Sequence, residues 1–406
     1  SVKASWAGKL AADGQSLSGH WTQRRSLPLD FARQKEAQAA PPIPPATYDP
    51  AIAPVEVSEM QAVLTRDLAR ALKSGMLAPG SSTGVSVGVL RGGVRRVFSY
   101  GTAKPDSIFE IGSVTKTFTG LVLAQMIEQG KVKLETPVRE LLPPGTVAKA
   151  EDHEITLLDL VTQHSGLARM PDNFAPADPN NPYADYHAAE LYQFIKQHGL
   201  VKPADATFLY SNLGFGLLGQ ALSNRAAMPY PQLLKEQITV PLGLKDTVVT
   251  LTPQQQSRFI PGHNAQHEQV HEWNLDALGG AGAIRSTADD LLTYLQANLH
   301  PESVNTSASA NARTLPKAIA LSHEVRNTAL PGMHIAFAWL REDAKGTYWH
   351  NGGTGGYSSF VFFNPQFDFA AVVLVNETLG RTGSFADRIG QHLAQRFAGK
   401  PALTLE

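Results

Sequence analysis

The sequence predicts an α+β domain, of the broad α/β class, in which helices flank an antiparallel sheet and an all-helical lobe is inserted. Strand-type residues alternate with polar ones near the start, over 84–100, and again near the end, over 334–375. Between them, residues 131–275 show mainly helical spacing of apolar side chains. We therefore expect 57–130 and 276–400 to build one sheet together, with a cleft between this part and the lobe.

The overall composition excludes several classes of protein. The chain has 406 residues, of which 43% are hydrophobic and 17% charged, so it can bury a sizeable core. Its net charge is -1 and no run of lysine or arginine stands out, which argues against nucleic acid as a partner. The absence of cysteine rules out disulfides, zinc–thiolate sites and a cysteine nucleophile. No apolar run reaches the roughly 18 residues of a transmembrane helix, so we expect none.

The first part of the chain differs in composition from the rest. Residues 1–36 carry isolated tryptophans and leucines among polar residues and glycines, a pattern typical of short strands and turns. The segment is too short for its own core, which leaves three alternatives: the remnant of a preceding β-type module, strands that add to the main domain, or a loosely attached tail. Residues 37–56 are rich in proline and predict a stiff, extended linker. The main domain is then expected over 57–400.

The main domain is expected to begin with a helix and a hairpin. Apolar residues three and four apart over 55–74 predict an amphipathic helix. Two strands follow at 84–90 and 94–100, because apolar and polar residues alternate there and Arg91-Gly92-Gly93 supplies a tight turn. This hairpin gives the sheet its first two strands.

The stretch after the hairpin carries the first chemical signal. Residues 109–112 predict a short extended approach and a glycine turn, followed by a helix that ends at Gly130. Ser113 stands where the helix begins and Lys116 lies three residues later, so the two side chains share a face. The helix is apolar almost all round and is expected to be buried. Burial lowers the pKa of a lysine, which lets it act as a base toward a serine, and free N–H groups at the helix start favour an oxyanion.

The inserted lobe contains a second candidate group, Tyr210-Ser211-Asn212. A glycine-dotted apolar run over 213–219 predicts a closely packed helix, so the tripeptide lies on the loop that enters it. A tyrosine near a lysine ammonium would have a lowered pKa and could pass protons. An asparagine amide offers a donor and an acceptor to a substrate. The alternative is a core tyrosine followed by a capping Ser-Asn pair.

Three histidines of the lobe, His263, His267 and His271, are spaced by four residues. On a helix they would share one face and could bind a metal ion. Pro261-Gly262 precedes them, their surroundings are irregular and rich in glutamine, and no carboxylate completes a hydrolase motif. We therefore expect a polar surface loop there, with no metal site and no cofactor.

The end of the chain predicts the remaining strands and a last helix. Strand-type residues recur in four segments, at 334–340, 347–350, 358–363 and 370–375. Pro365-Gln366-Phe367-Asp368 makes the turn between the last two, and a helix is expected over about 384–397. These strands complete the sheet that the first hairpin begins.

One of these strands ends in a third candidate group, His350-Asn351-Gly352-Gly353. Glycines concentrated at a strand end indicate that another backbone or a ligand approaches closely. Free N–H groups at such an edge could bind a substrate and contribute to an oxyanion hole. The alternative is a glycine-rich turn in a hairpin.

In this order, the three groups resemble the signatures of the serine β-lactamase and penicillin-binding protein superfamily. Ser113-Val114-Thr115-Lys116 matches its Ser-x-x-Lys motif, and Tyr210-Ser211-Asn212 resembles the second motif of the class C β-lactamase branch. That branch also includes D-alanyl-D-alanine carboxypeptidases and the β-lactamase-like esterases of family VIII. The resemblance extends from about Ser81 to Phe397, which implies the β-lactamase/transpeptidase-like fold with its active site in the cleft between sheet and lobe.

The resemblance also implies a role for the matching residues. Ser113 would be the acylated nucleophile and Lys116 its base. Tyr210 would pass protons to the leaving group and activate the deacylating water. Asn212 would bind the substrate amide, and the N–H groups of Ser113 and Gly353 would form the oxyanion hole.

The third motif departs from the family pattern. His350 stands where the family usually has a lysine and Asn351 where it usually has a threonine; together with Gly352 they would bind the substrate. Because histidine is mostly neutral at pH 7, binding of a substrate carboxylate is expected to weaken there and to recover in acid. The departure resembles carboxypeptidases and esterases of the branch, and it argues against fast β-lactam hydrolysis.

A serine acyl hydrolase that works through a covalent acyl-enzyme is therefore implied, acting on D-alanyl-D-alanine-type peptides or β-lactams. The alternatives are a carboxylesterase for small acyl esters and a non-catalytic penicillin- or peptidoglycan-binding protein. The partner is a small molecule or peptide, and the oligomeric state stays open. The resemblance further implies a periplasmic or secreted bacterial protein, and any signal peptide would have been removed before Ser1.

Overall fold

An eight-stranded antiparallel sheet organises most of the chain, in the order β12-β13-β14-β15-β16-β17-β6-β7. The structure is a computed structural model that describes residues 5–12, 16–22, 26–28, 31–32, 45–77, 81–378 and 383–405. The chain divides into two units, 1–45 and 46–406, and the sheet belongs to the second. Its strands are β6 (Gly84–Arg91), β7 (Val94–Gly101), β12 (Asn327–Leu330), β13 (Met333–Ile335), β14 (Leu340–Glu342), β15 (Tyr348–Gly353), β16 (Ser358–Asn364) and β17 (Phe369–Val375).

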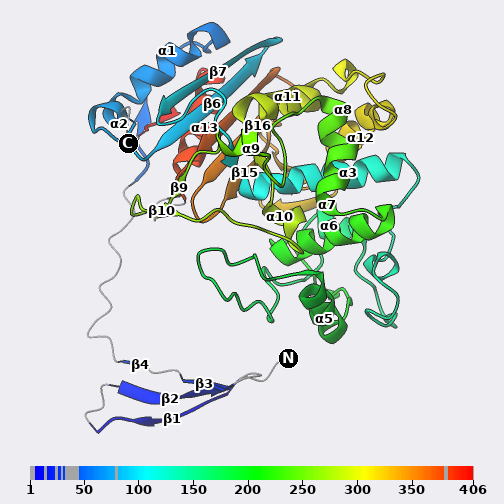
Figure 1. Cartoon of the computed structure of the whole chain (residues 1–406). Helices are drawn as coiled ribbons and strands as arrows, with labels where there is room; N and C mark the ends of the chain where they lie inside the picture. The colour runs from blue at the N-terminus through cyan, green and yellow to red at the C-terminus, as the bar shows by residue number, and fades with distance from the viewer. Residues whose placement is uncertain are drawn as a thin grey trace. The chain divides into compact units, whose positions relative to one another are not determined.

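The two ends of the second unit meet in this sheet, as the sequence predicts. Strand β17 pairs with β6 along its whole length, from Phe369 opposite Arg91 to Val375 opposite Val85. Figure 1 shows the blue strands β6 and β7 in the same sheet as the orange strands of the C-terminal part. The expected antiparallel sheet with flanking helices is therefore confirmed.

Side chains alternate between the two faces of the sheet and fill two separate cores. Val373 and Val375 of β17 pack into one core with α1 (Val57–Asp67) and α13 (Phe385–Phe397). Their neighbours Val372 and Leu374 belong to the other core. That core is shared with three further helices, which are α3 (Thr115–Glu128), α11 (Ala288–Leu299) and α12 (Leu315–Ser322). The two-residue period of a strand thus divides the helices into two layers.

Helix α3 lies inside the second core and is buried on all sides. A 3₁₀ turn at Gly112–Val114 leads into it, and every residue from Thr115 to Met126 is buried. It packs against α12, α6 (Asn212–Ala226) and α10 (Gly279–Gly282). The predicted buried helix is confirmed, and these contacts fix the position of its first turn.

The region 131–275 is not entirely helical. It contains a short antiparallel pair, β9 (Gly262–His263) and β10 (Gln269–Val270), around a turn in which His267 has a positive φ of 62°. Its helical pieces are α4 (Leu157–Val161), α5 (Ala188–His198), α6, α7 (Tyr230–Leu234), α8 (Val240–Leu242) and α9 (Pro253–Gln256), with a 3₁₀ turn at Val138–Leu141 and a π-helical turn at Lys235–Thr239. Further short elements of the unit are α2 (Ala69–Lys73), the pair β8 (Phe109–Glu110) and β11 (Arg285–Ser286), and 3₁₀ turns at Pro301–Ser303 and Asn311–Arg313.

The strand predicted over 334–340 is interrupted. Strand β13 ends at Ile335, and the chain then leaves the sheet until β14 begins at Leu340. In the interval Ala338 takes a positive φ of 66° and its N–H donates to the carbonyl of Val161. The strand is interrupted because the chain turns here to bury Phe337 and Trp339 fully in the core around α3.

The boundary of the expected linker 37–56 also differs. Residues 37–44 lie outside the described residues, whereas 46–56 belong to the second unit. There β5 (Tyr48–Asp49) pairs with β18 (Ala402–Leu403), and the carbonyl of Pro50 accepts a hydrogen bond from buried Arg396. The unit boundary therefore falls at residue 45, because partners distant in sequence hold this proline-rich segment.

The first unit holds four described strands, β1 (Ser5–Leu10), β2 (Ser16–Thr22), β3 (Ser26–Pro28) and β4 (Phe31–Ala32). Strand β2 pairs antiparallel with each of the other three. Among the described residues of both units, no helix combines the length and apolar character needed to span a bilayer.

Candidate active site

The structure places Ser113 and Lys116 in direct contact at the start of α3. Ser113 is the middle residue of the 3₁₀ turn, and the Lys116 Nζ lies 3.0 Å from the Ser113 Oγ. Gly112 opens the turn with a positive φ of 48°, a conformation that favours glycine. In this turn the N–H of Val114 donates to the carbonyl of Ile111 and that of Thr115 to the carbonyl of Gly112, whereas the N–H of Ser113 stands at the helix start, where N–H groups have no partner within the helix.

The amine of Lys116 is completely buried. Its Nζ donates to Asn212 Oδ1 at 2.9 Å and to the carbonyl of Ala281 at 2.7 Å. Burial lowers the pKa of Lys116 well below its usual value, and the positive charge of Arg169 lowers it further. A neutral amine can donate its two N–H groups to these oxygens and turn its lone pair toward Ser113. The arrangement suits a base that removes the hydroxyl proton.

Tyr210 lies beside this pair, but its acidity is the reverse of the sequence expectation. The Lys116 Nζ is 4.9 Å from the centre of the Tyr210 ring. Loss of water around the phenol raises the pKa of Tyr210 to about 12, although a hydrogen bond with Ser113 acts in the opposite direction. The predicted lowering is wrong because it assumed a charged lysine. Tyr210 is thus a neutral phenol that can donate a proton.

Asn212 is the first residue of α6 and is held there by a cap. The Ser211 Oγ accepts from the N–H of Gly214 at 2.8 Å, which starts the helix. With its carbonyl oxygen bound to Lys116, Asn212 keeps its amide Nδ2 3.9 Å from the sulfur of Met170. The amide N–H groups are therefore the part of Asn212 that can reach a substrate acceptor.

The end of β15 lies directly against the turn that holds Ser113. A Cβ on Gly352 would stand 2.1 Å from the carbonyl oxygen of Ile111 and 2.9 Å from the backbone N of Ser113. The N–H of Thr354 donates to Tyr357 across the hairpin, and because bonding positions alternate in an antiparallel ladder, the N–H of Gly353 points away from β16. The structure thus brings the N–H groups of Ser113 and Gly353 to one place.

His350 faces the same region but is uncharged. Its side chain is buried, and its Nδ1 donates to the carbonyl of Asn351 at 2.6 Å, which leaves Nε2 as an acceptor. Burial is the largest cause that lowers the pKa of His350, to about 3. The ring therefore stays neutral in mild acid, and the recovery of carboxylate binding in acid that the sequence predicts is expected only near pH 3.

Asn351 points away from Ser113. Successive side chains of a strand alternate, and the Asn351 Nδ2 donates to Asp387 Oδ1 of α13 at 3.0 Å, on the opposite face of the sheet. The expectation that Asn351 binds a substrate is not supported by this geometry. Its visible role is to connect β15 to α13.

A small cavity of about 20 Å³ opens at Ser113. Tyr183 and Trp273, whose ring centres are 5.0 Å apart, form part of its wall together with Leu275. Sequence reasoning missed both rings and also Arg169, whose guanidinium lies 5.2 Å from the centre of the Tyr210 ring. The only signal in the sequence was the length of the loops that carry them.

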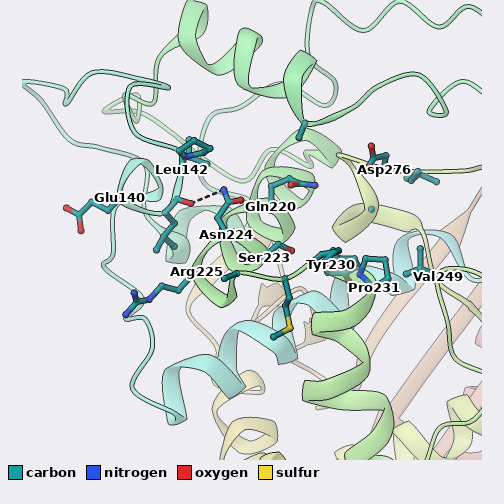
Figure 2. A pocket seen from close by; sticks show the side chains of 18 of the residues that line it. Glu140, Leu142, Gln220, Ser223, Asn224, Arg225, Tyr230, Pro231, Val249 and Asp276 are labelled. Atoms are coloured by element: carbon teal, nitrogen blue, oxygen red, sulfur yellow. Dashed lines mark hydrogen bonds between the residues drawn. The ribbon is translucent and has the colours of Figure 1, made fainter.

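A wider cavity of about 810 Å³ lies on the helical lobe. Figure 2 shows Gln220 and Asn224 of α6 on one side of it and Tyr230 and Pro231 of α7 on another. It shares Leu275 with the cavity at Ser113 but contains none of the candidate residues. The candidate residues Ser113, Asn212 and Gly353 all line the smaller cavity.

The three histidines of the lobe do not share a helical face. His263 lies on β9 and its Nδ1 is 3.3 Å from the carbonyl of Asn376, while His267 lies 3.4 Å from Glu377. Elsewhere in the described residues, Asp49, Asp67 and His392 lie close enough to share a metal ion. Arg396 already supplies a positive charge there, since its Nε donates to Asp67 at 2.8 Å.

Comparison with known proteins identifies the family. The family model described as β-lactamase matches residues 68–395, which is most of the chain. The chain belongs to the β-lactamase family. The D-alanyl-D-alanine-carboxypeptidase/endopeptidase AmpH of Escherichia coli K12 is 30% identical over 337 residues, 79% of this chain and 86% of that protein. A β-lactamase of Pseudomonas fluorescens is 28% identical over 340 residues, 72% of this chain and 88% of that one.

Solved structures of this β-lactamase family share the fold. A class C β-lactamase from Rhodobacter sphaeroides matches with a TM-score of 0.64 at 23% identity, over 78% of this chain and 95% of that one. A second class C β-lactamase matches with a TM-score of 0.65 at 21% identity, over 82% and 96%. The β-lactamase/transpeptidase-like fold predicted from the sequence is therefore confirmed, and the β-lactamase family match covers all three motif groups.

Proposed function

We propose that this β-lactamase-family protein is a serine acyl hydrolase that forms a covalent acyl-enzyme on Ser113. The observation that carries the proposal is the buried Lys116, whose Nζ lies 3.0 Å from the Ser113 Oγ and is held by Asn212 and Ala281. Burying a lysine ammonium costs free energy, so a lysine is a poor choice for stabilising the fold at this position. A neutral lysine beside a hydroxyl can instead act as a base that takes the hydroxyl proton.

Acylation begins when the neutral amine of Lys116 takes the proton of the Ser113 hydroxyl. The Ser113 Oγ attacks the substrate carbonyl, and the N–H groups of Ser113 and Gly353 donate to the oxyanion that forms. The bond to the leaving nitrogen or oxygen then breaks, and the Tyr210 phenol gives it a proton. The Lys116 ammonium returns a proton to Tyr210, so the pair ends as it began.

Deacylation reverses these proton transfers with water as the nucleophile. Water gives a proton to Lys116, directly or through Tyr210, and attacks the ester carbonyl of the acyl-enzyme. Ser113 leaves and recovers its hydroxyl proton from Lys116. A poorly activated water would leave the acyl-enzyme in place, and the protein would then bind penicillin without turning it over.

D-alanyl-D-alanine-type peptides and β-lactams are the proposed substrates. The relative named as a D-alanyl-D-alanine-carboxypeptidase/endopeptidase and the relatives named as β-lactamases support this class. A peptidoglycan substrate would place the protein in the periplasm or outside the cell. A carboxylesterase activity is the second candidate, favoured by the neutral His350 and by the apolar wall of Tyr183, Trp273 and Leu275 around Ser113.

Intact-protein mass spectrometry after exposure to benzylpenicillin tests the proposal. We expect an adduct of one penicillin on the wild type and none on Ser113→Ala. Ser257→Ala is the matched control, because Ser257 is exposed and, among the described residues, its Oγ binds only the nearby carbonyl of Gln254. It should give the wild-type adduct.

The lifetime of the penicillin adduct and the turnover of p-nitrophenyl acetate decide between the candidate activities. A lasting adduct with slow release supports a carboxypeptidase or a penicillin-binding protein. Fast turnover of p-nitrophenyl acetate without a penicillin adduct supports the esterase. Full activity of Ser113→Ala on every substrate would contradict the whole scheme.

A further inference from the structure

The proposed substrates carry a carboxylate, yet the expected cation of the third motif is missing. The His350 ring is buried and neutral, with its Nδ1 bound to the carbonyl of Asn351. Lys116 is also buried, and oxygens of Ser113, Asn212 and Ala281 surround its amine. Neither residue offers a fixed positive charge to an anionic ligand.

Arg169 is an exposed cation beside this site. Its guanidinium lies 5.2 Å from the centre of the Tyr210 ring, an arrangement that orients it by cation–π attraction. Its backbone is pinned to the start of α6, because its carbonyl accepts the N–H groups of Asn212 at 3.0 Å and Leu213 at 3.2 Å. The arginine is therefore attached to the same helix start that positions Asn212.

The charge of Arg169 acts on the groups around Ser113. Burial is the larger cause of the lowered pKa of Lys116, and Arg169 adds to it. The same charge opposes the rise in the pKa of Tyr183, a wall residue of the Ser113 cavity. Among the described residues, no carboxylate forms an ion pair with Arg169, so its guanidinium remains available to a ligand.

We propose that Arg169 binds the carboxylate of anionic substrates and supplies the positive charge that His350 does not. This inference rests on the proposed acyl-enzyme at Ser113. A guanidinium suits the role, because its planar N–H groups match a carboxylate in two parallel hydrogen bonds and it never loses its charge. Contact with Tyr210 places the carboxylate on the side of the cleft where the leaving group receives its proton.

Benzylpenicillin and its methyl ester separate this role from a general effect, because they share the reacting bond and differ only in the carboxylate. The measurement is the second-order rate constant for acylation of Ser113, followed by intact-protein mass spectrometry. For Arg169→Gln we expect the rate with benzylpenicillin to fall about 10- to 100-fold, the value of a charge-assisted hydrogen bond. The methyl ester should change much less.

Two further variants complete the test. Arg169→Lys keeps the charge but loses the paired hydrogen bonds, so it should recover part of the lost rate. Arg96→Gln removes an exposed arginine of β7 whose Nη1 binds only the carbonyl of Arg95 in the part of the chain that the structure describes, and it should leave both rates unchanged.

Equal losses with both compounds would overturn the inference, since Arg169 would then act through Lys116 or through the fold. Unchanged rates with both would overturn it as well. If the wild type is acylated by neither compound, the proposed function fails and the inference falls with it. If both compounds acylate the wild type and Arg169→Gln loses the same factor in rate with each, the inference is overturned but the proposed function stands.

Discussion

At the scale of single residues, burial determines which groups around Ser113 carry charge. It lowers the pKa of Lys116 and of His350, and it raises that of Tyr210. All three shifts favour the uncharged form. These three groups are then neutral at rest, and the first proton transfer from Ser113 creates charge beside hydrogen-bond donors that are already in place.

The neutral state of His350 gives a pH prediction with a definite sign. A lowered pKa means that a histidine keeps its neutral form to lower pH, so with a pKa of about 3 the ring should not titrate between pH 8 and pH 5. Ring signals in a ¹H–¹³C NMR titration, assigned with His350→Gln, measure this directly. A midpoint near the ordinary value of about 6.5 would show that the ring is hydrated or paired with an acid.

Contacts between single residues were predictable where helix geometry fixes them. Ser113 and Lys116 stand three apart at a helix start, so the sequence alone predicts that their side chains meet, and they lie 3.0 Å apart. Arg169 was not predictable, because it lies on an irregular loop whose path depends on distant residues. The acidity of Tyr210 was predicted with the wrong sign, because the sequence does not reveal how strongly Lys116 is desolvated.

At the scale of elements, the site depends on the close approach of β15 to the turn before α3. The approach is possible because Gly352 faces Ile111 and Ser113, where no side chain fits. The glycine pattern predicts such an approach. It does not predict strand register, which turns Asn351 toward Asp387 and away from Ser113.

Adding one methyl group at this approach should disable the site. In Gly352→Ala the new Cβ would stand 2.1 Å from the Ile111 carbonyl oxygen, so β15 must move away from the Ser113 N–H. We expect acylation by benzylpenicillin to slow by at least about 100-fold, the usual cost of losing an oxyanion donor.

Gly279→Ala is the matched control for this substitution. Its Cβ would meet only Tyr230 at 3.6 Å and Ala283 at 3.7 Å, which are ordinary contacts, and Gly279 itself does not line the Ser113 cavity. Urea unfolding of both variants separates loss of the site from loss of the fold. Acylation of Gly352→Ala at the wild-type rate would contradict the role assigned to this contact.

At the scale of the whole molecule, the fold was predictable because both ends of the second unit carry strand patterns around a helical middle. Pairing of β17 with β6 confirms that arrangement. The unit boundary was not predictable, since a proline-rich stretch indicates an extended chain without showing what it packs against. Residues 46–56 are extended, but Arg396 and β18 bind them from more than 300 positions away.

Truncation tests this boundary. The fragment 46–406 keeps both cores and every candidate residue, so we expect it to fold and to be acylated like the full chain.

The fragment 57–406 also loses β5, the Pro50 carbonyl that accepts from Arg396 at 2.9 Å, and the buried Val55, whose N–H donates to the carbonyl of Arg396. Arg396 is almost fully buried, and a buried polar group left without a partner costs about 1–3 kcal/mol, or more when it is charged. The melting temperature of the fragment 57–406 should therefore be several degrees below that of the fragment 46–406, when both are measured by scanning calorimetry. Equal melting temperatures would restore residue 56 as the boundary.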